Sequence, residues 1–171
     1  MLQLREWAAR GRLFAILDAT DTPGVPKLAK RLGEDRAVSL YRGRAEEELW
    51  AIAPYLVHLD VATLEWISES LWPTPWGIFA LADESLDDLR LHFRRFLVVE
   101  SPTGESWYFR FYDPRVLVKY LPTCTAGELD EFFGPIKAFA VTDPETYGVR
   151  VLLAGEPAPA RPEPVPVRMR R

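Results

Sequence analysis

The apolar residues of this chain occur in short runs separated by polar turns, and the runs follow two different periods. The segment Leu13–Asp18 is a continuous apolar run that stops at an acid, which is typical of a central strand buried on both faces. Shorter apolar runs predict strands at 37–41, 55–59, 78–81, 97–100, 139–141 and 149–153. Helical spacing of apolar residues predicts helices at 25–32, 45–52, 63–71, 85–97, 114–121 and 126–133. The pattern therefore predicts an α/β fold in which short strands and helices form a mixed sheet with packed helices.

The stretch 107–112 is almost entirely aromatic and is followed directly by Asp113 and Pro114. Aromatic residues favour a pleated, half-buried strand, whereas Asp-Pro is typical of a helix N-cap followed by the first helical residue. We therefore expect a hairpin of 97–100 with 107–112, whose second strand passes into a helix within one residue. In this interpretation Asp113 is a structural cap, and Arg110 or Arg115 forms an ion pair with it.

The chain predicts a single domain at 1–155, followed by a flexible Pro/Arg-rich tail at 156–171. Five prolines fall within the last sixteen residues, and they are incompatible with a helix or a central strand there. A Thr125–Glu128 capping box and the Gly134-Pro135 pair are expected to begin and end the last helix before the tail.

Charge and composition exclude several classes of function. Residues 1–155 contain 17 basic and 23 acidic side chains, so the expected domain is acidic and is a poor partner for nucleic acid. The single cysteine cannot form an intramolecular disulfide, which favours a cytoplasmic protein. The two histidines cannot build a His-rich or Cys-rich zinc site, although counting residues leaves a carboxylate site open. We expect no metal and no cofactor. No apolar run suggests a signal peptide or a membrane span.

The sequence has no motif that is specific for catalysis. His58 or His92 could act as a general base, but no nucleophile elbow accompanies either of them, and no phosphate-binding loop is present. Asp18, Glu100 and Asp113 could supply paired carboxylates, although their spacing is equally typical of strand ends. We expect no catalytic residue, and we keep as an alternative a small hydrolase that uses Asp18, His58 or Asp113.

Six residues are candidates for binding a partner protein. They are large aromatic or cationic side chains, of the kinds enriched at interface hot spots. Trp72 and Trp76 lie in a proline-bracketed loop, and Arg94 and Arg95 lie on the polar side of a predicted helix beside Arg90. Tyr112 and Arg115 stand at the aromatic edge of the predicted hairpin. For each group a structural or merely solvated role is the alternative interpretation.

Several segments occur in an order that resembles a known protein family. The most specific are Ala-Pro-Tyr-Leu-Val at 53–57, which contains Pro54 and Tyr55, and Arg-Phe-Tyr-Asp-Pro-Arg at 110–115. Weaker segments lie at 14–19, 39–43, 76–78, 91–97 and 132–136. Together, from 12 to 136, they resemble the type VI secretion effector chaperones, the Tap or Tec adaptors, in a short version.

The resemblance implies a cytosolic bacterial adaptor that is not an enzyme. Such a protein binds a toxic effector and promotes its loading onto the VgrG spike of the secretion machine. It also implies that Asp18, Pro54, Tyr55, Arg110, Asp113 and Pro114 form the structural motif of the family. A toxin-immunity protein remains a further alternative, because it would fit the size and acidity of the chain.

Overall fold

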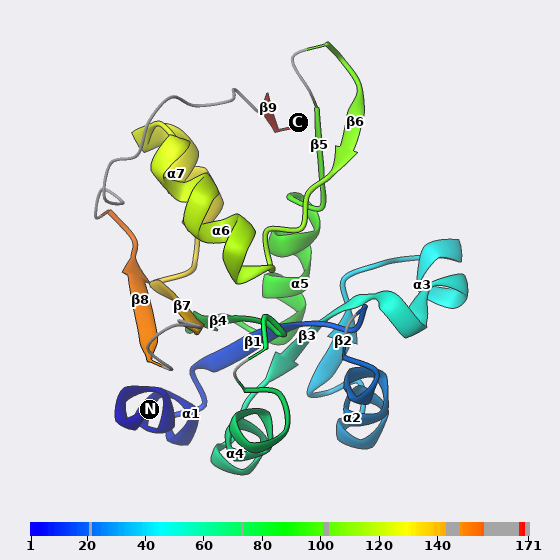
Figure 1. Ribbon diagram of the computed structural model, residues 1–171, viewed down its shortest axis with the longest axis vertical. Coiled ribbons are helices and arrows are strands. Elements are labelled where there is room, and N and C mark those ends of the chain that lie inside the picture. Colours follow the sequence, from blue (N-terminus) through cyan, green and yellow to red (C-terminus); the bar gives the residue numbers. More distant parts are fainter. Residues whose placement is uncertain (21, 73, 101–102, 143–147, 156–167, 170–171) are drawn as a thin grey trace.

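Six strands form one twisted sheet across the middle of the molecule (Figure 1). The computed structural model describes residues 1–20, 22–72, 74–100, 103–142, 148–155 and 168–169. The strands lie in the spatial order β2 (Ala37–Ser39), β3 (Pro54–His58), β1 (Leu13–Asp18), β4 (Gly77–Leu81), β7 (Ala138–Thr142) and β8 (Val149–Leu153). The predicted α/β class is confirmed.

The sheet differs from the expected mixed sheet in strand direction, because all five pairings between its described strands are antiparallel. Strand direction depends on how each connection returns across the sheet, and alternation of strands and helices along the chain does not specify this.

Strand β1 is the buried centre of the sheet, as its apolar sequence predicted. All six of its residues are buried, and it pairs with β3 on one side and β4 on the other. Alternate residues point to opposite faces, as the period of a strand requires. Phe14 and Ile16 belong to one apolar core, whereas Ala15 and Leu17 belong to the other.

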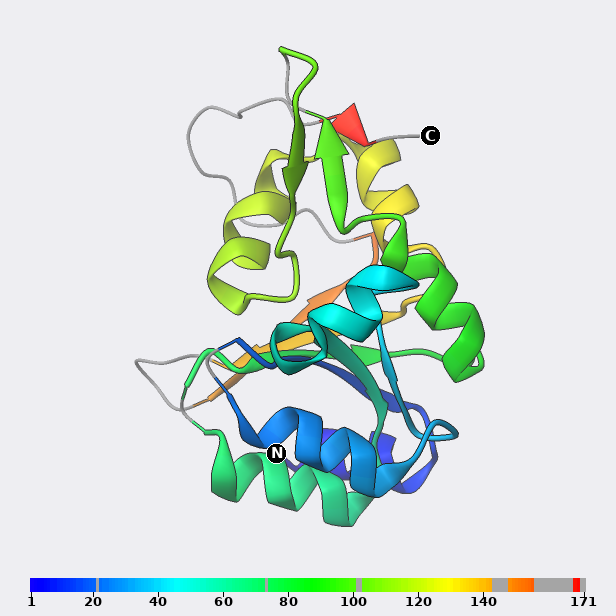
Figure 2. The ribbon, with the colours of Figure 1, turned by 90° about the vertical axis from the view of Figure 1, so that its right-hand side faces the viewer.

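Helices cover both faces of this sheet, so the domain has three layers (Figure 2). One face is covered by α1 (Leu2–Ala9), α2 (Gly24–Leu32) and α4 (Val61–Ser70). The other face is covered by α5 (Leu86–Arg94), α6 (Pro114–Tyr120) and α7 (Ala126–Phe133). A short helix α3 (Arg44–Glu48) and a 3-10 turn η1 (Trp50–Ile52) connect β2 to β3 at one edge.

The expected hairpin is present but shorter than its aromatic content suggested. It consists of β5 (Val98–Glu100) and β6 (Ser106–Tyr108), so the prediction of a strand as far as 112 was wrong. Phe111 and Tyr112 are both fully buried, but they lie in a turn and pair with no described strand. The chain instead turns here, and the Asp113 amide donates to the Arg110 carbonyl at 3.0 Å.

The predicted helix caps are confirmed. Asp113 accepts from the Arg115 amide at 2.9 Å, with Pro114 as the first residue of α6. Thr125 and Glu128 form the complete capping box that begins α7, and Gly134 ends this helix. After α6 a 3-10 turn η2 (Leu121–Thr123) leads to α7.

Part of the predicted tail lies beside the hairpin. Arg168–Met169 form the short strand β9, which pairs antiparallel with β5. The rest of the tail, 156–167 and 170–171, lies outside the described residues, so its predicted flexibility stays a prediction.

Candidate functional site: a groove at the β2 edge

The two most specific sequence blocks meet at one buried carboxylate. Asp18 ends β1 with its side chain 4% exposed, and it pairs in register with Pro54 of β3. Arg110, 92 positions further along the chain, donates to the Asp18 Oδ2 atom. The Asp18 Oδ1 atom accepts from the Thr20 amide at 2.9 Å. The expected structural motif is therefore a contact that joins the sheet to the segment after the hairpin.

Asp113 forms a second, separate pair, and its partner is Arg115. The Arg115 Nε and Nη2 atoms lie 2.9 Å and 2.6 Å from the two carboxylate oxygens. Burial alone would raise the pKa of Asp113, but the hydrogen bonds from Arg115 outweigh it and hold this pKa below its ordinary value. Of the two partners considered for Asp113, Arg115 is the one that binds it, because Arg110 is engaged by Asp18.

Two of the six predicted partner-binding residues are buried, and a third is held by main-chain carbonyl groups. Trp76 and Tyr112 are each 1% exposed, so neither presents surface to another protein. Arg94 donates to the carbonyl oxygens of Leu40, at 2.9 Å, and Tyr41. The surface roles predicted for Trp76 and Tyr112 were wrong, because burial against distant elements cannot be seen in a local sequence window.

The other three candidates are dispersed over the fold. Trp72 is half-buried against the core on the α4 face, and Arg95 is exposed with an ion pair to Glu131 at 3.0 Å. Arg115 is exposed at the start of α6 and holds Asp113. These three side chains belong to separate parts of the chain, namely the loop after α4, the end of α5 and the start of α6.

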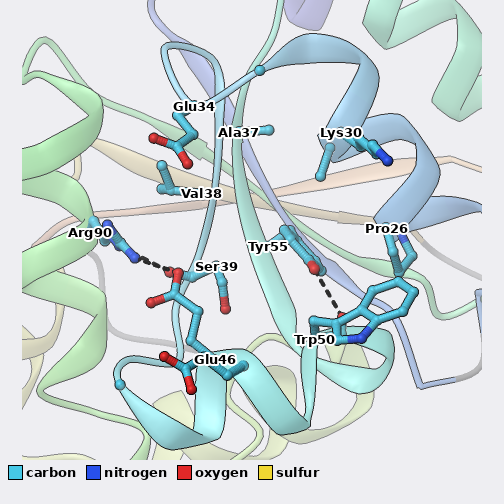
Figure 3. A pocket seen from close by; sticks show the side chains of 14 residues that line it. Pro26, Lys30, Glu34, Ala37, Val38, Ser39, Glu46, Trp50, Tyr55 and Arg90 are labelled. Carbon is cyan, nitrogen blue, oxygen red and sulfur yellow. Dashed lines mark hydrogen bonds and ion pairs between the residues drawn. The ribbon is translucent and has the colours of Figure 1, made fainter.

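The structure instead shows a groove of about 770 Å³ at the β2 edge of the sheet (Figure 3). Strand β2 lies between Arg90 of α5 on one side and Pro26 and Lys30 of α2 on the other (Figure 3). The α3–η1 segment, with Glu46 and Trp50, borders one end. The lining residues are Pro26, Ala29, Lys30, Gly33, Glu34, Ala37, Val38, Ser39, Gly43, Glu46, Glu47, Trp50, Tyr55 and Arg90.

Three large apolar side chains stand exposed beside this groove. Leu49, Trp50 and Ile52 are 42%, 56% and 44% exposed. All three lie within residues 48–52, and we call this segment the η1 shoulder. Because water-exposed apolar groups of this size favour burial against another surface, the η1 shoulder is a candidate contact region.

Polar contacts hold the η1 shoulder in place. The Tyr55 hydroxyl donates to the Trp50 carbonyl at 2.9 Å, and burial together with the nearby Glu46 carboxylate raises the pKa of Tyr55. Arg90 Nη2 lies 2.8 Å from a Glu46 oxygen, and its Nε donates to the Ser39 carbonyl at 2.9 Å. The groove and its shoulder are thus tied to α5, β2 and β3.

Sequence reasoning missed this site. The 45–52 segment was interpreted only as a short acidic helix, and Arg90 only as part of a polar helix face. The available signal was the presence of Leu49, Trp50 and Ile52 at positions that cannot all lie on one helix face. The groove itself depends on the position of β2 at the sheet edge, which no local pattern reveals.

The residues considered for hydrolysis do not assemble. Asp18 pairs with Pro54 and His58 pairs with Phe14, so the two lie at opposite ends of β1 and β3. At about 3.3 Å per residue this separates them by roughly 13 Å along the strand. His92 is buried, and its Nε2–H donates to the Phe132 carbonyl at 2.9 Å. None of these residues lines the groove.

Within the described residues, no group of three or more His, Cys, Asp or Glu side chains could hold a metal ion. In the same part of the chain, no helix has both the length and the apolar character needed to cross a bilayer.

A family model matches residues 13–131, which is most of the chain. The matching family is described as a domain of unknown function, DUF4123. The chain belongs to this family, which is associated with adaptors of type VI secretion. No curated protein and no solved structure matches the chain significantly.

Proposed function

We propose that this protein is a non-enzymatic, cytoplasmic adaptor that binds one cognate type VI secretion effector and promotes its loading onto the VgrG spike. Membership of a family associated with such adaptors supports this role. The resemblance of 53–57 and 110–115 to the effector chaperones supports it as well.

The single structural observation behind this proposal is the η1 shoulder beside an open groove. An exposed tryptophan next to a concave, partly apolar surface is typical of a site that binds a protein segment. Trp50 lines the groove, and Leu49 and Ile52, its neighbours in the same segment, are exposed as well. An adaptor with such a surface would shield an aggregation-prone part of the effector, because binding lowers the concentration of the free effector.

The arrangement of charged groups favours binding over catalysis. Asp18 and Asp113 are each engaged by an arginine, and His58 lies at the opposite strand end from Asp18. A hydrolase needs a nucleophile, a base and an orienting group within hydrogen-bond reach of one another. The hydrolase alternative has no comparable support.

The proposal predicts that a toxin gene lies near this gene, and co-expression with that toxin tests it. We expect the effector's soluble yield to rise and the two proteins to copurify through a sizing column, with VgrG joining the complex. If the three purified proteins elute separately, the proposal is wrong. A cellular assay separates the immunity alternative: deletion of an adaptor gene blocks delivery to a target cell, whereas deletion of an immunity gene kills the producing strain.

A further inference from the structure

We propose that the β2 edge takes an extended peptide as an added strand, and that the peptide is apolar with a lysine or arginine at its flank. In the cell this peptide would be a segment of the bound effector, so the assignment of its source depends on the proposed function. The binding mode itself follows from the main chain of β2 and from the walls of the groove.

The register of β2 on β3 determines which backbone groups face the groove. The His58 amide donates to the Arg36 carbonyl, and the Leu40 amide donates to the Pro54 carbonyl, at 2.8 Å and 2.9 Å. In an antiparallel ladder hydrogen-bonded and non-hydrogen-bonded pairs alternate. Ala37 and Ser39 occupy the non-hydrogen-bonded positions, so their amides and carbonyls point away from β3, into the groove.

Two of these four outward groups already have partners. The Ala37 amide donates to the Gly33 carbonyl at 2.9 Å, which closes one end of the edge. The Ser39 carbonyl accepts from Arg90 at 2.9 Å and from Arg94 at 3.4 Å, which closes the other end. Such capping limits uncontrolled pairing of an edge strand.

The remaining two groups are the Ala37 carbonyl and the Ser39 amide, and no described residue hydrogen-bonds to either of them. These two groups lie on either side of Val38. In a parallel pair of strands, a single residue of the added strand can donate its amide to the Ala37 carbonyl and accept from the Ser39 amide with its carbonyl. The edge is therefore closed at both ends and open in its middle. Main-chain hydrogen bonds of this kind are the basis of peptide recognition by strand addition.

The residues that form the walls of the groove indicate which kinds of side chain a bound peptide would carry. Pro26, Ala29 and Trp50 supply apolar surface. The lining contains two exposed carboxylates, Glu34 and Glu47, and one exposed cation, Lys30. The other two charged groups of the lining, Arg90 and Glu46, form an ion pair with each other. The remaining charge is acidic, as is the 1–155 region as a whole, so a basic flank on the peptide is electrostatically complementary.

Replacing Ser39 by proline removes the outward amide and leaves the ladder to β3 intact, because proline is tolerated at an edge position whose N–H faces away from the sheet. The matched control is Ser39→Ala, which keeps the amide and loses the hydroxyl. Both variants lose the hydrogen bond from the Tyr41 amide to the Ser39 hydroxyl, so this loss does not contribute to the difference between them.

The probe is a short fluorescent peptide of alternating valine and threonine with lysine at both ends, measured by fluorescence anisotropy. We expect Ser39→Ala to bind like the unchanged protein and Ser39→Pro to bind about fivefold or more weakly, as the loss of one hydrogen bond implies. A second variant, Glu47→Lys, is expected to bind the lysine-ended peptide more weakly. It should bind the same peptide with glutamate ends more tightly. Circular dichroism confirms that each variant is folded.

Absence of binding to the unchanged protein, or equal affinities of the two Ser39 variants, would overturn the inference. A concentration-dependent dimer that Ser39→Pro abolishes would also overturn it, because the edge would then pair with a second copy. The same variants are then tested for effector copurification. If the effector binds the unchanged protein and Ser39→Pro equally, the inference fails while the proposed function stands. If peptide binding behaves as expected but no effector binds, only the proposed function fails.

Discussion

Arg110 and Asp18 are 92 positions apart in the chain, and their side chains form an ion pair where the central strand ends. The carboxylate is 4% exposed and the arginine side chain 37% exposed, so the pair lies at the boundary between the core and the surface. It joins β1 to the turn between the hairpin and α6. The pair is therefore one of the contacts that hold the hairpin unit on the sheet, together with the apolar packing of Phe111 and Tyr112.

Removing the cation should destabilise the fold strongly. In Arg110→Met the aliphatic stem remains, but the buried Asp18 carboxylate loses its partner. Because Arg110 is partly exposed, we expect a loss of about 2 kcal/mol, below the usual cost for a fully buried pair. Urea unfolding at neutral pH measures it. Adding Asp18→Asn should recover part of the loss, because the unpaired charge is then gone.

The matched control for this substitution is Arg95→Met. Arg95 pairs with Glu131, and both side chains are about half exposed. Exposed pairs of this kind contribute about 0–1 kcal/mol, so the free energy of unfolding should hardly change. Equal losses in the two variants would show that the Asp18 contact has no special structural role.

Asp113 should contribute to stability both as a cap and through its charge. We expect Asp113→Ala to lower the free energy of unfolding by about 1–2 kcal/mol, because α6 loses its N-cap. Asn keeps a capping oxygen, so Asp113→Asn should lose less. Chemical denaturation of the three proteins measures the difference, and similar losses for Ala and Asn would contradict the capping role.

The contribution of Asp113 to the free energy of unfolding should also depend on pH. The pKa of Asp113 is lower in the folded protein than in the unfolded chain, where it is about 3.9. Its charge-dependent stabilisation is therefore complete above that value and is lost as the pH falls through the lowered folded pKa. The acid loss of stability should be steeper in the unchanged protein than in Asp113→Asn, as denaturation at several acidic pH values would show.

His92 should make the protein less stable in mild acid. Burial lowers the pKa of His92 below its ordinary value of about 6.5. Above that value folded and unfolded states are both neutral at this residue, and below it the unfolded chain binds the proton first. Stability should therefore fall as the pH drops through the ordinary pKa toward the lower folded one. The fall should be smaller in His92→Gln, and identical pH profiles would contradict this assignment.

Two glycines of the α7 region should respond to alanine in opposite directions. At Gly134 the backbone φ is +48°, and an added Cβ would lie 2.6 Å from Cε1 of the buried His92 ring. We expect Gly134→Ala to cost about 1–3 kcal/mol. At Gly127, inside the helix, an added Cβ meets nothing within 4 Å, so Gly127→Ala should gain about 0.5–1 kcal/mol. Thermal unfolding of both variants would test the pair.

Trp50 should dominate effector binding. It is 56% exposed beside the groove, and its truncation in Trp50→Ala should weaken the effector complex by about tenfold or more, as for a hot-spot tryptophan. Trp107→Ala is the matched control, because Trp107 is 46% exposed on the hairpin. Calorimetric titration compares the two. A larger effect at Trp107 would assign the contact to the hairpin instead.

The sequence alone determined the features that depend on neighbouring residues. The Asp113-Pro114 start of α6, the Thr125–Glu128 box and the buried run Leu13–Asp18 are all present as expected. A cap involves atoms within one helical turn, and a strand buried on both faces is apolar at every position. Such features can be recognised from a short window of residues.

Only the tertiary structure decided which distant residues meet. It paired Arg110 with Asp18 rather than with Asp113, and it buried Trp76 and Tyr112, which were expected at a surface. It also placed β2 at the sheet edge, where the groove forms. Strand order and burial depend on how the hydrophobic faces of all elements pack together, so no single segment encodes them.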